Sequence, residues 1–162
     1  MAIHRRQFLT YLTTIATLSA LPHSVRAAIT SRIAAQFGHI PASATIHRVI
    51  SAGPPTDQLL LALAPEKLLG FSSLNVEKSP LFSDELRKLP RLGRLSGRGS
   101  TLSLEALLTL EPDIIIDSGN VDETYRSLAK RVSDQTGVPY VLIDGILKDS
   151  PAQLRQTGAL LG

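Results

Sequence analysis

The chain has 162 residues, no cysteine and a formal net charge of +3 at pH 7. Residues 1–27 hold three of the 17 lysines and arginines and none of the 14 acidic residues, so the remainder carries 14 of each sign and is formally neutral. This balance removes the simplest argument for nucleic-acid binding. The absence of cysteine excludes disulfides and a lipid anchor attached through a cysteine of this sequence.

A pair of arginines, Arg5 and Arg6, stands near the start of the chain and is followed by the apolar residues Phe8 and Leu9. The uncharged stretch behind them contains several threonines and is too short for a membrane anchor, which needs about 20 mainly apolar residues. Together with the small residue Ala27, this pattern predicts a twin-arginine signal peptide over residues 1–27. We therefore expect export by the twin-arginine translocase and a periplasmic mature protein; an amphipathic N-terminal helix is the alternative.

Small and polar residues dominate the next segment, residues 28–47. This composition predicts a linker that includes a short helix at residues 31–37. The folded lobe is expected to begin at Arg48 and to extend over residues 48–162 as one domain.

The first half of this lobe alternates short apolar runs with a helix. Thr56 is expected to cap the helix, which carries a run of leucines and stops at Pro65. Three short runs are expected to form strand segments, at residues 48–52, 68–71 and 91–95.

The second half gives the strongest pattern. Three consecutive isoleucines, Ile114 to Ile116, suit a strand that is buried on both faces. Expected elements are a helix at residues 103–109, a strand at 113–117, a helix at 122–135, a strand at 139–144 and a helix that starts with a capping box at 150–153. This alternation predicts an α/β fold with three layers, in which helices flank a mostly parallel sheet.

Ligands of open parallel sheets bind beyond the carboxyl ends of the strands. The residues at those ends are small, hydroxylic or basic, and turns or a solvated loop are the alternative explanation for them. The candidate ligand-binding residues are Gly53, Pro54, Pro55, Phe71, Ser72, Arg94, Arg98, Ser118, Gly119 and Asn120.

The sequence lacks the usual signatures of catalysis. After residue 27 only His39 and His47 can supply imidazole, there is no Gly-x-Ser-x-Gly motif, and the glycine-rich residues 93–101 lack the lysine of a phosphate-binding loop. We therefore expect no catalytic residue, no metal site of the protein itself and no cofactor. A small exported α/β hydrolase that uses Ser72 or Ser118 is the alternative.

Several segments in their order resemble the N-terminal lobe of the periplasmic substrate-binding proteins of ABC importers for ferric siderophores, haem and vitamin B12. The resemblance runs from about His47 onward and is most specific where a helix is followed by x-Pro-Asp and an apolar strand. Its motifs are residues 48–54, 56–60, 67–71, 102–108 and 111–116.

The resemblance implies two α/β lobes joined by a long helix, with a metal chelate as ligand between them and an ABC permease as partner. It also implies that Glu105 docks onto permease arginines, although a carboxylate also favours the first turn of a helix for electrostatic reasons. We expect the chain to be the N-terminal lobe only, truncated before the bridging helix and the C-terminal lobe. A one-lobe module that docks on a permease without carrying ligand is a further alternative.

Overall fold

A four-stranded sheet with the spatial order β1–β4–β3–β2 forms the middle layer of the fold. The strands are β1 (Ile33–Phe37), β2 (Val49–Ser51), β3 (Ile114–Gly119) and β4 (Tyr140–Asp144). The three strands β2, β3 and β4 run parallel, whereas β1 is antiparallel to β4. This computed structural model describes residues 33–97 and 99–162; Arg5, Arg6, Arg98 and the signal peptide expected at residues 1–27 lie outside the described residues.

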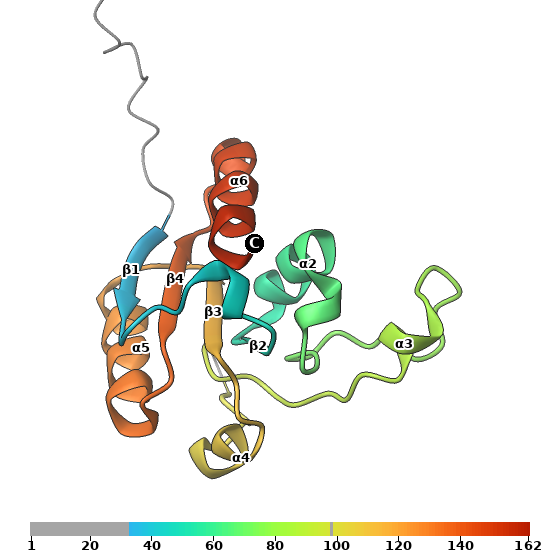
Figure 1. Ribbon diagram of the computed structural model, residues 1–162, viewed down its shortest axis with the longest axis horizontal. Coiled ribbons are helices and arrows are strands. Elements are labelled where there is room, and N and C mark those ends of the chain that lie inside the picture. Colours follow the sequence, from blue (N-terminus) through green and yellow to red (C-terminus); the bar gives the residue numbers. More distant parts are fainter. Residues whose placement is uncertain (1–32, 98) are drawn as a thin grey trace, which may run out of the picture. The chain divides into compact units, whose positions relative to one another are not determined.

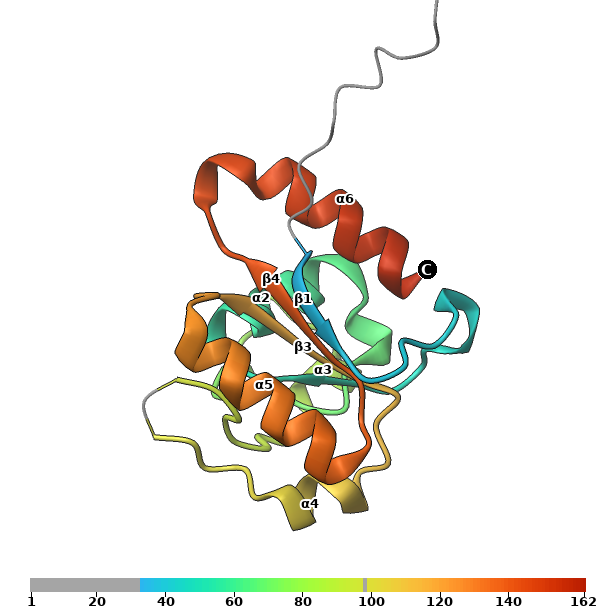
Figure 2. The same cartoon turned by 90° about the vertical axis from the view of Figure 1, so that its left-hand side faces the viewer.

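Helices cover both faces of the sheet, which confirms the three-layer α/β prediction (Figure 1). One face is covered by α2 (Pro54–Leu63) and α6 (Ser150–Leu161), and the other by α5 (Glu123–Thr136) and α4 (Leu104–Thr109). Figure 2 shows the sheet between α5 below it and α6 above it. None of the described helices is long and apolar enough to cross a membrane.

The alternation of side chains along β3 explains the two cores. Ile114 and Ile116 pack in the cluster that includes Leu60 of α2 and Leu161 of α6. Ile115 points to the opposite face and packs in the cluster that includes Ala129 of α5. All three isoleucines have no exposed surface, as predicted for a strand that is covered on both sides.

Local capping signals set two helices where they were expected. The Ser103 hydroxyl accepts a hydrogen bond from the Ala106 amide at 3.1 Å and caps α4. The Asp122 carboxylate caps α5 by accepting from the amides of Thr124 and Tyr125. Gly137, with φ at 73°, ends α5 in the left-handed conformation that glycine adopts without strain.

The helix predicted at residues 31–37 is wrong, because Ile33–Phe37 form the edge strand β1. Pairing with β4 outweighs the helical propensity of the alanines, since Phe37 lies opposite Tyr140 and Ile33 opposite Ile143. The predicted linker, residues 28–47, thus contributes a strand, followed by a short 3-10 helix, Ser43–Thr45.

The starts of α2 and α6 also differ from the prediction. Gly53, and not Thr56, is the N-cap of α2, and the Thr56 hydroxyl instead accepts a hydrogen bond from the Ser118 amide at 2.7 Å. The capping box at the start of α6 does not form. A 3-10 turn, Leu147–Asp149, precedes that helix, and the Gln153 side chain donates to the Ile146 carbonyl at 2.9 Å.

The segments expected as strands at residues 68–71 and 91–95 form only single parallel bridges, Val49 with Leu68 and Phe71 with Arg91. A proline limits the pairing, because Pro90 has no amide hydrogen and can only accept, from Phe71 at 2.9 Å. A 3-10 turn, Pro65–Lys67, leads into the first segment. Between the two segments the chain projects from the lobe and carries the short helix α3 (Asp84–Arg87), at the right of Figure 1.

Candidate functional site

The carboxyl ends of the parallel strands meet at one edge of the sheet, and hydrogen bonds hold their loops together. The amides of Leu95 and Ser96 donate to the Ala52 carbonyl at 3.0 and 3.1 Å, which fixes the loop after residue 94 to the end of β2. The Gly145 amide donates to the Gly119 carbonyl at 2.8 Å and joins the ends of β3 and β4. The loops predicted to bind a ligand therefore converge.

Small residues are needed where these loops touch. A Cβ atom on Gly145 would lie 2.6 Å from the Gly119 Cα, which is too close for any other residue type without a shift of the backbone. Gly119 itself has φ at 138°, which side-chain-bearing residues rarely adopt. A Cβ on Gly119 would also lie 3.7 Å from Pro55, so the first helical turn of α2 borders the end of β3.

An open pocket of about 570 Å³ lies beside this edge. Residues of the bridge-forming segment at 91–95, and those that directly follow the segment at 68–71, form most of its lining. Arg91 and Arg94 supply positive charge, and the pocket's described lining includes no acidic side chain. We call it the arginine pocket; its lining residues are Ser72, Ser73, Arg91, Leu92, Gly93, Arg94 and Thr101. Guanidinium and hydroxyl groups in this combination suit an anionic ligand with several oxygen atoms.

Arg94 is held in place by its own loop. Its amide donates to the Thr101 hydroxyl at 3.0 Å, and its Nη2 donates to the Gly99 carbonyl at 3.3 Å. The Arg94 carbonyl accepts from the amides of Thr101 and Leu102 and from the Ser100 hydroxyl. The guanidinium therefore sits on a closed loop and not on a free chain segment.

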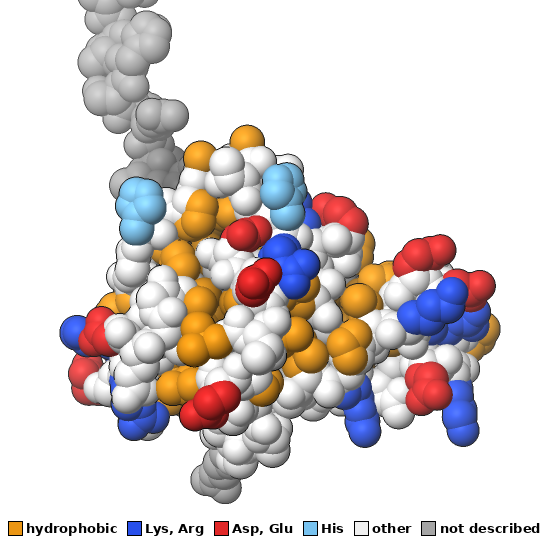
Figure 3. Space-filling model, turned by 60° about the horizontal axis from the view of Figure 1, so that its bottom comes forward, with side chains coloured by type: hydrophobic (Ala, Val, Ile, Leu, Met, Phe, Trp, Pro, Cys, Tyr) orange, Lys and Arg blue, Asp and Glu red, His pale blue; other side chains and the backbone are white. Residues whose placement is uncertain are grey.

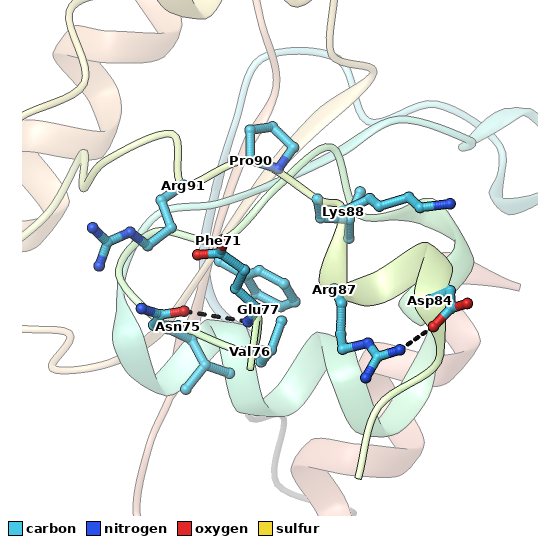
Figure 4. A pocket seen from close by; sticks show the side chains of 11 residues that line it. Phe71, Asn75, Val76, Glu77, Asp84, Arg87, Lys88, Pro90 and Arg91 are labelled. Carbon is cyan, nitrogen blue, oxygen red and sulfur yellow. Dashed lines mark hydrogen bonds and ion pairs between the residues drawn. The ribbon is translucent and has the colours of Figure 1, made fainter. Parts of the chain in front are cut away.

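A second pocket, of about 690 Å³, lies on the other side of Arg91, under the projecting segment (Figure 4). We call it the α3 pocket. It carries charges of both signs, including the ion pair of Arg87 with Asp84. Phe71 forms part of its wall but has no exposed surface, so the ring supports the pocket from the core.

A buried carboxylate that no sequence motif marks fixes the wall between the two pockets. Asp57 on α2 is fully buried and accepts hydrogen bonds from Ser72, Ser73 and Leu74. In the sequence it is only an acidic residue in the first turn of a helix, and its partners lie 15 to 17 positions away.

A second buried carboxylate lies in β3. Asp117 accepts from the Ser96 hydroxyl at 3.1 Å and from the Tyr140 hydroxyl at 2.9 Å, so it connects the loop after Arg94 to two strands. Burial raises the pKa of Asp117, while the hydrogen bonds from Tyr140 and Ser96 act in the opposite direction. Burial and the nearby Asp117 charge also raise the pKa of Tyr140.

The structure brings most of the predicted ligand-binding residues to this edge, but they differ in burial and in hydrogen bonding. Ser72 and Arg94 line the arginine pocket, although the Ser72 hydroxyl is buried and donates to Asp57. The Asn120 side chain is exposed and donates to Asp122 at 2.9 Å. Phe71 lines the α3 pocket instead. The other described candidates border the edge without lining the arginine pocket: Gly53 and Ser118 are buried, Pro54 and Pro55 are exposed at the start of α2, and Gly119 is half-buried.

Glu105 is exposed in the first turn of α4. Hydrogen bonds from its own backbone amide and from the Ser103 side chain lower the pKa of this carboxyl group, so it is ionised at neutral pH. Figure 3 views the molecule from the side on which α4 lies and shows acidic and basic side chains scattered around an apolar middle. An accessible, charged Glu105 is compatible with docking, which stays a prediction.

Groups for covalent catalysis are not assembled among the described residues. Neither Ser72 nor Ser118 has a hydrogen bond to a histidine there, and both described histidines, His39 and His47, are exposed. In the same part of the chain, no three His, Cys, Asp or Glu side chains lie close enough together to hold a metal ion.

Comparisons with known proteins give a likeness in fold. No protein-family model matches the sequence, and no curated protein sequence matches it either. Among solved structures, the fold is similar to an ABC transporter solute binding protein from Sulfurospirillum deleyianum DSM 6946, with a TM-score of 0.55 and 23% identity. The match covers 72% of this chain and 37% of that chain. At this identity the likeness shows a shared fold, and this chain corresponds to well under half of the longer protein.

Proposed function

We propose that this chain is a substrate-binding component of an ABC importer, in the form of one lobe of such a protein. The observation that carries the proposal is an open, arginine-lined pocket beside the edge where the parallel strands end, in a fold similar to that of a solute binding protein. Binding without bond making or breaking needs no catalytic group. Such binding is consistent with a Ser72 hydroxyl that is engaged in a hydrogen bond to the buried Asp57.

The proposed ligand is a metal chelate of the ferric siderophore, haem or cobalamin type, as the family resemblance implies. Arg91 and Arg94 favour the anionic members of this group, because a guanidinium binds carboxylate and catecholate oxygens through charge-assisted hydrogen bonds. The chelate is cargo, and the protein itself needs no resident cofactor to hold it.

The proposed site of action is the periplasm, reached through the twin-arginine translocase, with an inner-membrane ABC permease as partner and Glu105 as a docking residue. Replacing Arg5 and Arg6 together by lysine is expected to leave the precursor in the cytoplasm. Periplasmic recovery of the double variant at the wild-type level, measured by cell fractionation, would rule out this export route.

Calorimetric titration tests the binding proposal directly. The protein without residues 1–27 is titrated with ferric catecholates, ferric hydroxamates, haem and cobalamin, beside the variants Arg94→Gln and Arg155→Gln. Arg155 is exposed on α6 and serves as the matched control. Loss of one solvent-accessible charge contact is expected to weaken binding up to about fivefold in Arg94→Gln, with no change in Arg155→Gln.

Three outcomes contradict the proposal. The first is that no chelate binds the wild-type protein, and the second is that Arg94→Gln binds as tightly as the control. The third is that the chain binds a permease, in a separate binding assay, while it carries no chelate. The last result would instead identify a docking module with one lobe.

A further inference from the structure

Asp57 holds an unusual position for a charged side chain. It lies in the first turn of α2, has no exposed surface, and has no Lys, Arg or His ion-pair partner among the described residues. A carboxylate in such a place is tolerated only if hydrogen-bond donors replace the water that it has lost.

Four donors surround this carboxylate. The Ser72 amide donates to Oδ1 at 2.8 Å, and the Ser72 hydroxyl donates to Oδ2 at 2.9 Å. The amides of Ser73 and Leu74 both donate to Oδ2 at 3.1 Å. Three consecutive amides thus point at one anion, which is the arrangement that backbone nests provide for anionic groups.

The segment that these bonds fix is the wall between two pockets. Ser72 and Ser73 line the arginine pocket, whereas the neighbouring Leu74 and Asn75 line the α3 pocket. Figure 4 shows Arg91 and Asn75 across the α3 pocket from the ion pair of Arg87 with Asp84, and Arg91 also lines the arginine pocket. Because the Leu92 amide donates to the Phe71 carbonyl at 2.8 Å, the wall is also tied to the strand segment that carries Arg91.

We propose that Asp57 is a positioning residue: its carboxylate pre-organises the wall at Ser72–Leu74, so that Arg91 faces a formed pocket on either side before any ligand arrives. Without this anchor, a loop of small polar residues would have to be ordered at the moment of binding, and this ordering weakens affinity. The part of the proposal that concerns ligands rests on the proposed function, whereas the part that concerns the loop does not.

Hydrogen exchange of the whole protein tests the loop directly. In Asp57→Asn the side-chain oxygen remains an acceptor, but the NH₂ group that replaces the other oxygen faces hydrogen-bond donors. The hydrogen bonds to either Oδ1 or Oδ2 are therefore lost. Amide exchange at Ser72–Leu74 is expected to become about tenfold faster, while exchange in β3 and β4 changes much less. Ser72→Ala removes only the hydroxyl bond and is expected to give a smaller local increase. Asp134→Asn, on the exposed surface of α5, is the control and is expected to change nothing at the loop.

A uniform increase in exchange over the loop and both strands would show that Asp57 only supports the fold, and unchanged exchange at the loop would show that it positions nothing. Ser72→Ala keeps the carboxylate, so it reports on the loop even if Asp57→Asn fails to fold. Titration with the iron(III) tris-catecholate complex adds the binding arm: weaker binding by Asp57→Asn than by Asp134→Asn supports the proposal, and equal binding overturns its ligand part. If the wild-type protein binds none of the chelates, the proposed function fails, and the exchange data still decide the role of Asp57 in the loop.

Discussion

At the scale of single residues, Asp117 is the group whose ionisation most directly concerns the fold. Its carboxyl is buried between β3, β4 and the loop that carries Ser96, and burial raises its pKa above the value for an exposed aspartate. A raised folded-state pKa means that the native protein binds the proton more tightly than the unfolded chain does. The resulting stability is fully present below the unfolded pKa of about 3.9 and is lost as the pH rises through the folded pKa.

Asp117→Asn is therefore expected to remove this pH dependence. The asparagine oxygen can accept from Tyr140, and its NH₂ can donate to Ser96, whose hydroxyl already lies 3.4 Å from the Ala52 carbonyl and can donate there. In urea unfolding between about pH 3 and pH 8, the stability of wild type relative to the variant should fall as the pH rises. A difference that stays constant across this range, or that grows with pH, would contradict the assignment.

The residues of the candidate site were only partly predictable at this scale. Ser72 and Arg94 were predictable because they lie at the carboxyl ends of expected strand segments, and such ends converge in a parallel sheet. Asp57 and the role of Thr56 were missed because their partners, Ser72 and Ser118, are distant in sequence. No local pattern marks a helix-start acid as the anchor of a loop that comes later in the chain.

At the scale of elements, β1 shows why an edge strand is difficult to predict and how this one is protected. Its register shifts between Ile33 and Ala35 relative to β4, which leaves Ala34 in a bulge. Arg126 of α5 donates from Nη1 to the Ala34 carbonyl at 2.9 Å and from Nε to the Val121 carbonyl at 3.0 Å. The guanidinium thus donates a hydrogen bond to an edge carbonyl that could otherwise accept one from another chain.

Arg126→Met is expected to lower the free energy of unfolding by about 1–2 kcal/mol, because it leaves two backbone carbonyls without their donors. Amide exchange at Ala35–Phe37 should rise more than in β3. Arg131→Met, which changes an exposed arginine of the same helix, is the control and should stay within about 0.5 kcal/mol of wild type in urea unfolding. Equal stability of the two variants would show that the Arg126 hydrogen bonds do not support β1.

Elements with a strong internal pattern were predicted from the sequence, and those that depend on distant pairing were not. The isoleucine run gave β3, and the stripe of apolar residues between Asp122 and Gly137 gave α5, since each pattern matches one secondary-structure period. The alanine-containing residues 33–37 have no such pattern, and only the register with β4 makes them a strand. The segments at residues 68–71 and 91–95 are predicted as strands but pair through one bridge each.

At the scale of the whole molecule, charge is organised locally. Apart from residues 1–27 the chain carries 14 basic and 14 acidic residues, so no overall field attracts a ligand of either sign. The arginine pocket concentrates two guanidinium groups without an acidic residue in its described lining. Under the proposed function, discrimination between chelates would therefore come from this pocket and would act over a short distance.

This arrangement predicts an order of affinities and its dependence on salt. The protein without residues 1–27 should bind an anionic iron(III) tris-catecholate more tightly than uncharged cobalamin, and cobalamin more tightly than a cationic ferric hydroxamate. Because Ser73, Arg91 and Thr101 are exposed, each charge contact should contribute only about 0–1 kcal/mol, which corresponds to at most about a fivefold change in the dissociation constant. Raising NaCl from about 50 to 300 mM should weaken catecholate binding several-fold and leave cobalamin binding unchanged, since salt screens only the charged ligand. Titrations at both salt concentrations measure this difference. Tighter binding of the cationic hydroxamate, or catecholate binding that does not respond to salt, would show that the two arginines do not select the ligand.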